Sequence, residues 1–206
     1  MLSETLIFDF DGTIADTYEL SLKLVREAVP GTTDESFKKL FEGDIGTVVN
    51  ESKKLQAIDF HGKYSRHILE QHIVPSLSEI IPQLATSYRL FIISSSQTEP
   101  INAFLHHHKL KQYFAKIYGL DVHPNKTEKF RTVLAEYRLD PTNCLMITDT
   151  LGDINQAHAA NINTIAVSWG VHPEDTLRRG HPVTILESPL QLRQAVEDYF
   201  NETEEF

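Results

Sequence analysis

Residues 5–13 read TLIFDFDGT, an apolar run that ends in two aspartates and a glycine. Short runs rich in β-branched and aromatic residues are typical of buried strands, so we expect a strand over residues 5–10. Side chains two apart on an extended chain point to the same side, and this places the carboxylates of Asp9 and Asp11 in one pocket. Crowded carboxylates need either a bridging cation or a proton on one of them. An Asp-Gly turn would account for Asp11 but not for Asp9.

Similar apolar runs recur along the rest of the chain. We expect further strands over residues 89–94, 116–121, 144–149, 164–169 and 182–187. Segments with helical spacing lie between them, at residues 100–108, 126–138 and 153–161. Alternation of strands and helices is typical of a parallel sheet with helices on both faces, so we predict an α/β fold.

The segment after the first strand departs from this alternation. It holds helical patterns at residues 18–29, 36–41, 45–58 and 63–72 and no convincing strand. We expect an all-helical cap domain over residues 16–79 and an α/β core formed by residues 1–15 and 80–206. An insert at this point would lie over the carboxyl ends of the strands, where open α/β proteins bind ligands. The polar residues 201–206 are expected to fray.

A second pair of carboxylates follows the predicted strand over residues 144–149. Asp149 ends this strand as Asp9 ends the first, and Asp153 comes at the start of the next helical stretch. Parallel strands deliver their carboxyl ends to one edge of the sheet, so the two pairs can converge on a cation that oxygen atoms coordinate. The alternative role for Asp153 is the N-cap of the next helix.

A hydroxyl and two ammonium groups are expected near the same edge. Ser94 is the first residue after the apolar run of the second strand. Ser96 and Glu99 match a capping box, which makes Ser96 the expected N-cap of the next helix. Lys126 opens the helix before the fourth strand, where an ammonium could neutralise a bound phosphate, and Lys129 follows it in the same helix.

In chain order, these motifs resemble those of the haloacid dehalogenase superfamily, in its capped phosphatase branch near the phosphoglycolate phosphatase-like proteins. The four motifs of that family correspond to Asp9-Phe-Asp11-Gly-Thr13, Ser94, Lys126 and Asp149-xxx-Asp153. The resemblance covers nearly the whole chain. It implies a Rossmann-like parallel sheet flanked by helices, with a small helical cap inserted after the first strand.

The resemblance also implies chemical roles for three aspartates. Asp9 would attack phosphorus to form an aspartyl-phosphate, and Asp11 would act as general acid and then as general base. Mg²⁺ would be held by the carboxylates of Asp9 and Asp149 and by the backbone carbonyl of Asp11. Without a cation, the negative charges of nucleophile and phosphate would repel each other.

Three further residues would serve the phosphoryl group in such a protein. Ser94 and Lys126 would bind its oxygens, and Asp153 would orient Lys126 or a metal-bound water. Two positions depart from the family pattern, because Thr148 stands where many relatives have Gly and no Pro follows Lys126. These departures leave Lys129 open as the alternative phosphate-binding lysine.

Composition limits the partners and the compartment. The chain of 206 residues has a formal charge of −10, which argues against nucleic acid or an anionic membrane as a partner. Its single cysteine, Cys144, cannot form an internal disulfide. The first residues lack a basic lead into a long apolar run, and no apolar run has the length of a membrane span. We therefore expect a cytoplasmic protein.

These observations lead to one functional hypothesis and two alternatives. We predict a Mg²⁺-dependent phosphatase that hydrolyses a small phosphorylated metabolite. The alternatives are a phosphomutase of the same fold and a binding or regulatory protein without turnover. The oligomeric state and the physiological substrate are left open, because the predicted cap helices carry no recognisable binding motif.

Overall fold

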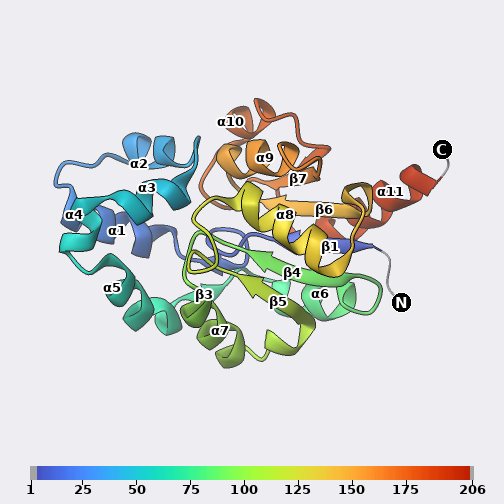
Figure 1. Ribbon diagram of the computed structural model, residues 1–206, viewed down its shortest axis with the longest axis horizontal. Helices are drawn as coiled ribbons and strands as arrows, with labels where there is room; N and C mark the ends of the chain where they lie inside the picture. The colour runs from blue at the N-terminus through green and yellow to red at the C-terminus, as the bar shows by residue number, and fades with distance from the viewer. Residues whose placement is uncertain (1–3, 205–206) are drawn as a thin grey trace.

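The computed structural model describes residues 4–204 and contains a central sheet of six strands (Figure 1). The strands lie in the order β5-β4-β1-β6-β7-β8, and every neighbouring pair is parallel. Their bounds are β1 (Thr5–Phe8), β4 (Arg89–Ile93), β5 (Phe114–Tyr118), β6 (Cys144–Thr148), β7 (Asn163–Val167) and β8 (Thr184–Leu186). This confirms the predicted α/β class with its Rossmann-like parallel sheet.

The sheet brings the ends of three strands close together. β1 lies between β4 and β6, and Phe8 at its end is in register with residues of both neighbours. Each strand ends earlier than the sequence predicted. As a result, Asp9, Ser94 and Asp149 lie outside the strands, as the first residues after β1, β4 and β6. Three polar residues therefore leave adjacent strands at one edge, where the chain order along the sheet reverses and ligand sites form in folds of this class.

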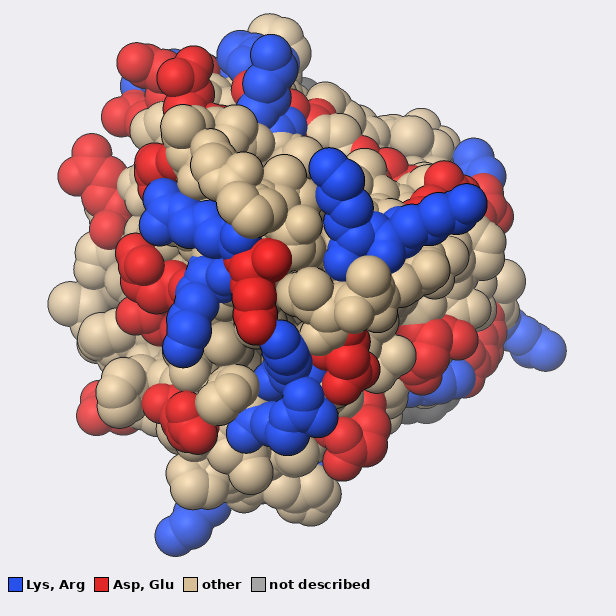
Figure 2. All heavy atoms as spheres, turned by 90° about the vertical axis from the view of Figure 1, so that its left-hand side faces the viewer, with Lys and Arg blue, Asp and Glu red and all other residues tan. Residues whose placement is uncertain are grey.

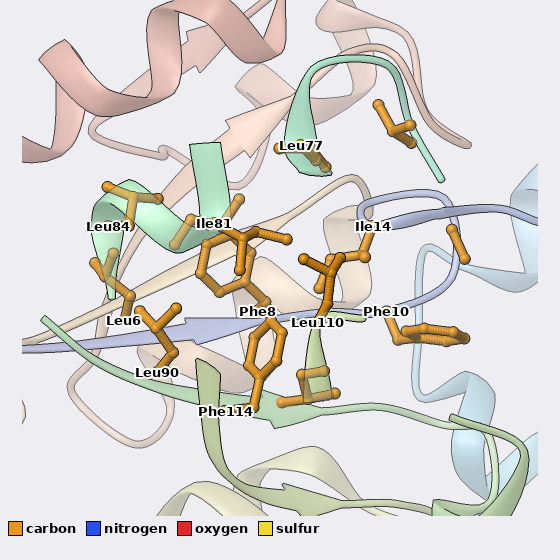
Figure 3. Close-up of a cluster of buried hydrophobic side chains, with 14 of the residues drawn as sticks. Leu6, Phe8, Phe10, Ile14, Leu77, Ile81, Leu84, Leu90, Leu110 and Phe114 are labelled. Carbon is orange, nitrogen blue, oxygen red and sulfur yellow. The ribbon is translucent and has the colours of Figure 1, made fainter. Parts of the chain in front are cut away.

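Helices cover both faces of the sheet. They are α6 (Leu77–Leu84), α7 (Thr98–His107), α8 (Lys126–Tyr137), α9 (Leu151–His158), α10 (Glu174–Arg178) and α11 (Leu192–Glu204). Leu6 and Phe8 of β1 lie in the main hydrophobic core with residues of α6, α7 and α11. Figure 3 shows part of this core. Ile7 packs on the opposite face with residues of α8 and α9. Alternate side chains of one strand thus supply apolar contacts to both layers.

Further helices follow β1 in the chain and lie beside the carboxyl ends of the strands (Figure 1). They are α1 (Tyr18–Ala28), α2 (Asp34–Leu40), α3 (Ile45–Glu51), α4 (Lys53–Ala57) and α5 (Phe60–His67). We refer to residues 18–67 as the helical segment. Leu22, Val25, Phe37 and Leu55 form a small hydrophobic core within it. The domain limits at residues 16 and 79 stay a prediction, and the second of them falls inside α6.

Two expectations for this region were wrong. Strand β2 (Ala15–Asp16) pairs antiparallel with β3 (His72–Ile73), although no strand was expected between residues 16 and 79. Two residues are too few to show the alternation by which a strand is recognised. The helix expected over residues 45–58 breaks at Ser52, whose backbone is extended and whose hydroxyl caps α4 by accepting from the Leu55 N–H at 3.4 Å.

The carboxyl-terminal part of the chain is helical where fraying was expected. α11 continues through residue 204, and its Leu192 and Val196 are buried in the main core. Residues 205 and 206 lie outside the described residues. Within residues 4–204, no helix combines the length and the apolar composition needed to cross a bilayer.

Candidate active site

The turn after β1 places two aspartates at the carboxyl edge of the sheet. Asp9 is only 5% exposed, and its backbone N–H donates to the carbonyl of Ile147 at 2.9 Å. Gly12 turns the chain with a φ of +75°, a conformation that glycine adopts without strain. A Cβ on Gly12 would lie 2.3 Å from Oδ2 of Asp149. The turn therefore needs glycine both for its backbone angle and for its close approach to Asp149.

Lys126 connects two of the predicted carboxylates. Its Nζ donates to Oδ1 of Asp9 at 2.7 Å and to Oδ2 of Asp153 at 2.6 Å, and all three side chains are buried. Lys126 begins α8, which Asn125 caps by accepting from the Glu128 N–H at 3.2 Å. Burial opposes the charge of Lys126, but Asp153 and Asp9 raise its pKa above the ordinary value. Lys126 is therefore a fixed cation at the centre of the site.

The two carboxylates beside Lys126 differ in their pKa values. Burial raises the pKa of Asp9 well above its ordinary value, although Lys126 opposes this shift. The negative charges of Asp153 and Asp149 raise the pKa of Asp9 further. Burial also opposes ionisation of Asp153, but the charge of Lys126 holds the pKa of Asp153 below its ordinary value. Asp153 is thus the stable anion of the pair, whereas the charge of Asp9 calls for a further cation.

Two threonines position Asp153. The hydroxyl of Thr150 accepts from the Asp153 N–H at 3.3 Å, so Thr150 is the N-cap of α9. The alternative in which Asp153 caps this helix was therefore wrong. Thr148, the residue that departs from the family's Gly, donates its hydroxyl to Oδ2 of Asp153 at 2.9 Å. This bond adds a second donor to the carboxylate oxygen that Lys126 contacts.

Asp149 is fully buried directly after β6. The hydroxyl of Thr13 donates to its Oδ1 at 2.8 Å, and the backbone N–H of Val171 donates to its Oδ2 at 2.7 Å. Burial raises the pKa of Asp149 to about 6 despite these two hydrogen bonds. A Cβ on Gly170 would lie 2.2 Å from Oδ2 of Asp149, so the loop after β7 also depends on glycine to approach it.

Asp11 is held by hydroxyl groups. Oδ1 accepts from Thr17 at 2.9 Å and from the hydroxyl of Tyr64 in α5, and Oδ2 accepts from Ser96 at 2.7 Å. Tyr64 is a functional candidate that the sequence did not reveal, because it lies in a helix of the insert with no motif around it. Burial, with the neighbouring Asp11, raises the pKa of Tyr64 well above its ordinary value, so Tyr64 stays a donor.

The role predicted for Ser96 was wrong. Helix α7 begins at Thr98, and its N-cap position is Gln97, which makes no capping bond with its side chain. The Ser96 hydroxyl is instead bonded to Asp11. The capping-box pattern is present in the sequence, but the helix starts too late for it to form. A short run of serines after a strand at this edge was the available signal for a hydroxyl in the site.

Ser94 and Lys129 lie together behind this loop. The Ser94 hydroxyl is 3.4 Å from Oδ2 of Asp11 and accepts from the Ser96 N–H at 2.9 Å. The ammonium of Lys129 donates to the backbone carbonyls of Ser94 at 2.5 Å and Gly119 at 3.5 Å. Lys129 is thus directed at the ends of β4 and β5, whereas Lys126 reaches the carboxylates. The structure brings the predicted residues to one place: Asp9, Asp11, Ser94, Lys126, Asp149 and Asp153.

A cavity opens between this edge and the helical segment. It encloses about 1190 Å³ of empty space, which includes its open mouth. Its floor contains Asp9, Asp11, Lys126 and Asp153, and the rest of its lining comes largely from helices α1 to α5. A ligand in this cavity would have one end against Asp9 and the other against the helical segment.

A divalent cation such as Mg²⁺ needs several oxygen ligands at this edge of the sheet. Within residues 4–204, no three His, Cys, Asp or Glu side chains are grouped in a position to hold a metal. The predicted magnesium ligands include only two side chains, the carboxylates of Asp9 and Asp149. The third protein ligand is the backbone carbonyl of Asp11, so a group of three side chains is not required. Both carboxylates have raised pKa values through burial, and hard oxygen donors of this kind suit Mg²⁺ with water as the remaining ligands. The residues present therefore fit a magnesium ion.

The chain is similar over most of its length to two curated proteins. The phosphoglycolate phosphatase of Synechococcus elongatus is 23% identical over 207 residues, which cover 94% of this chain and 97% of that protein. The tyrosine-protein kinase PtkA of Mycobacterium tuberculosis is 22% identical over 214 residues, which cover 94% of this chain and 72% of that protein. The first of these relatives is thus named as a phosphatase and the second as a kinase.

Solved structures show the same fold. The structure of a predicted phosphatase from Clostridium acetobutylicum superposes with a TM-score of 0.81 at 20% identity, covering 96% of this chain and 100% of that chain. The sequence itself matches the haloacid dehalogenase-like hydrolases over residues 6–167, which is most of the chain. As its motifs predicted, this protein belongs to the haloacid dehalogenase-like hydrolase family.

Proposed function

We propose that this protein is a Mg²⁺-dependent phosphatase that hydrolyses a small phosphomonoester through an aspartyl-phosphate on Asp9. The observation that carries the proposal is the buried ion pair between Lys126 and Asp9, with Asp11 on the same turn. Membership of the hydrolase family and the relative named phosphoglycolate phosphatase support it. The cytoplasmic location stays a prediction.

The first chemical step transfers the phosphoryl group to the protein. A carboxylate oxygen of Asp9 attacks phosphorus, and the bond between phosphorus and the leaving-group oxygen breaks. Protonated Asp11 gives its proton to that oxygen, so an alcohol departs rather than an alkoxide. Lys126 holds the carboxylate of Asp9, while Tyr64 and Ser96 fix the orientation of Asp11.

The second step returns the protein to its starting state. Asp11, now an anion, accepts a proton from water as the water oxygen attacks phosphorus, and the bond from phosphorus to Asp9 breaks. Inorganic phosphate leaves, and Asp11 is again protonated. Ser94 and Lys126 bind phosphoryl oxygens in both steps, and Asp153 keeps Lys126 in place through its 2.6 Å ion pair.

Mg²⁺ would be held by the carboxylates of Asp9 and Asp149 and by the backbone carbonyl of Asp11. It would supply the positive charge that lets an anionic carboxylate approach an anionic phosphate. The ammonium of Lys126 is already paired with the carboxylates of Asp9 and Asp153. The same single positive charge would also have to balance the charge of the phosphate. The bound metal ion would supply the positive charge that Lys126 alone does not provide.

Replacing the nucleophile should abolish turnover. For Asp9→Asn, kcat for p-nitrophenyl phosphate should fall by roughly a thousandfold or more, the order of loss that follows removal of a nucleophile in other hydrolases. The exposed Asp175 on α10 offers the control Asp175→Asn, which should keep full activity. Released inorganic phosphate is measured, which separates hydrolysis from transfer to another acceptor. Substantial activity of Asp9→Asn would exclude Asp9 as the nucleophile.

Metal removal should stop the reaction for an electrostatic reason. EDTA should eliminate phosphate release, and excess MgCl₂ should restore it, whereas NaCl of equal ionic strength should not. MgCl₂ should also raise the melting temperature of the protein, because it relieves repulsion among buried carboxylates, and this rise should be smaller for Asp149→Asn. Turnover that persists in EDTA contradicts the role given to Asp149.

Lys129 leads to a prediction about stability. Burial, with the nearby charge of Lys126, lowers the pKa of Lys129 from 10.5 to about 7. Between these pH values the unfolded chain binds more protons than the folded protein, so this group makes the free energy of unfolding rise with pH, by up to about 1.4 kcal/mol per unit.

Urea unfolding in EDTA at pH 7, 8 and 9 measures this effect. The rise in unfolding free energy with pH should be smaller in Lys129→Met than in the unmodified protein, because methionine does not titrate. Equal pH dependence in the two proteins would mean that Lys129 keeps an ordinary pKa and is free to serve as a permanent cation, which would reopen the choice between it and Lys126.

A further inference from the structure

The walls of the cavity differ in character from its floor. We give the name apolar wall to six lining residues of the helical segment: Val25, Leu40, Phe41, Val49, Leu55 and Phe60. Leu40, Phe41, Val49 and Phe60 are only partly buried by the small core of the segment. They therefore present apolar surface to the cavity, opposite the carboxylates and the ammonium of the floor.

The outer face of the helical segment is unlike the apolar wall. Figure 2 shows Lys and Arg side chains interspersed with Asp and Glu on this side of the molecule. Charges of both signs on the outside, with aliphatic and aromatic side chains inside, are the usual pattern of a surface in water that encloses an apolar binding site. The apolar wall is thus a feature of the cavity rather than of the general surface.

Positive charge is scarce within the cavity. Among its lining residues in the described part of the chain, Lys126 is the only lysine or arginine, and it is engaged by Asp9 and Asp153. His61 also lines the cavity, but burial lowers its pKa, so it is mainly neutral at pH 7. A second anionic group on a ligand would have no cationic partner at the wall, and burying an unpaired charge is costly.

We propose that the substrate of this site is the phosphomonoester of an uncharged aliphatic or aromatic alcohol, whose hydrocarbon part binds against the apolar wall. The proposal rests on the phosphatase function proposed above and narrows its substrate class. Water and the ester give inorganic phosphate and the free alcohol, with Asp11 supplying the proton to the alcohol oxygen. Phosphorylated carboxylic acids and pyrophosphate are poor substrates, because their second charge would be placed beside apolar side chains.

Alkyl phosphates of equal charge and increasing length, compared with two substrates that carry a second anionic group, test this directly. Methyl, butyl and hexyl phosphate are compared with phosphoglycolate and pyrophosphate by phosphate release in MgCl₂. The value of kcat/KM should rise by about fourfold for each methylene that is buried, and hexyl phosphate should exceed phosphoglycolate by at least about tenfold. No dependence on chain length, or faster hydrolysis of phosphoglycolate or pyrophosphate, overturns the proposal while leaving the phosphatase function intact. Failure to hydrolyse any of these esters or p-nitrophenyl phosphate overturns both.

Variants of the wall provide a second, independent test. Val49→Lys should lower kcat/KM for hexyl phosphate by at least about tenfold and raise it for phosphoglycolate, because it places a cation in the apolar wall. The control Val183→Lys, at a residue 50% exposed and outside the cavity, should change neither value.

A milder substitution covers the case in which the lysine prevents folding. Val49→Ala should lower kcat/KM for hexyl phosphate more than that for methyl phosphate, since methyl phosphate has only one carbon that could contact the wall. Circular dichroism verifies that each variant is folded. Unchanged hexyl phosphate hydrolysis in a folded Val49 variant contradicts binding of the hydrocarbon part at this wall.

Discussion

The buried ammonium of Lys126, shared by Asp9 and Asp153, is the interaction on which the rest of the site depends. It joins the end of β1 to the first turns of α8 and α9, three elements that are far apart in the sequence. Each of these charges would be costly to bury alone, and removing one partner of a buried ion pair typically costs about 3–5 kcal/mol. The three residues therefore stabilise one another, and the same contacts fix the carboxylate that the proposed mechanism uses for attack on phosphorus.

Charged and apolar side chains lie in different parts of the cavity. The floor comes from the turns after parallel strands and carries the charges, whereas the wall comes from the helical segment and is apolar. Tyr64 is one link between the two parts, because it belongs to α5 and donates to Asp11. Phe41 is another, because its backbone carbonyl accepts from the Gly152 N–H at 2.9 Å. Under the proposed function, this division would let the helical segment set the substrate class without altering the carboxylates of the floor.

The sequence was sufficient for the parallel α/β class and for most of the candidate site, because the alternation of strands and helices and the strand-end aspartates are patterns that can be read along the chain. It could not decide between Lys126 and Lys129, since residues three apart lie on one face of a helix and both are buried. Tyr64 could not be found, because its contact with Asp11 spans 53 residues and depends on how α5 packs. The capping box at Ser96 failed because a local pattern was overridden by hydrogen bonding to a distant carboxylate.

In the proposed mechanism, the carboxylate of Asp9 that Lys126 holds becomes the phosphoryl carrier. Rapid acid quenching during steady turnover, followed by proteolysis and mass spectrometry of the peptides, tests it most directly. One added phosphoryl group is expected on the peptide that contains Asp9, and none in Asp9→Asn. Turnover without a covalent phosphoryl group on the protein, or a phosphoryl group located at another residue such as Ser94, would contradict it.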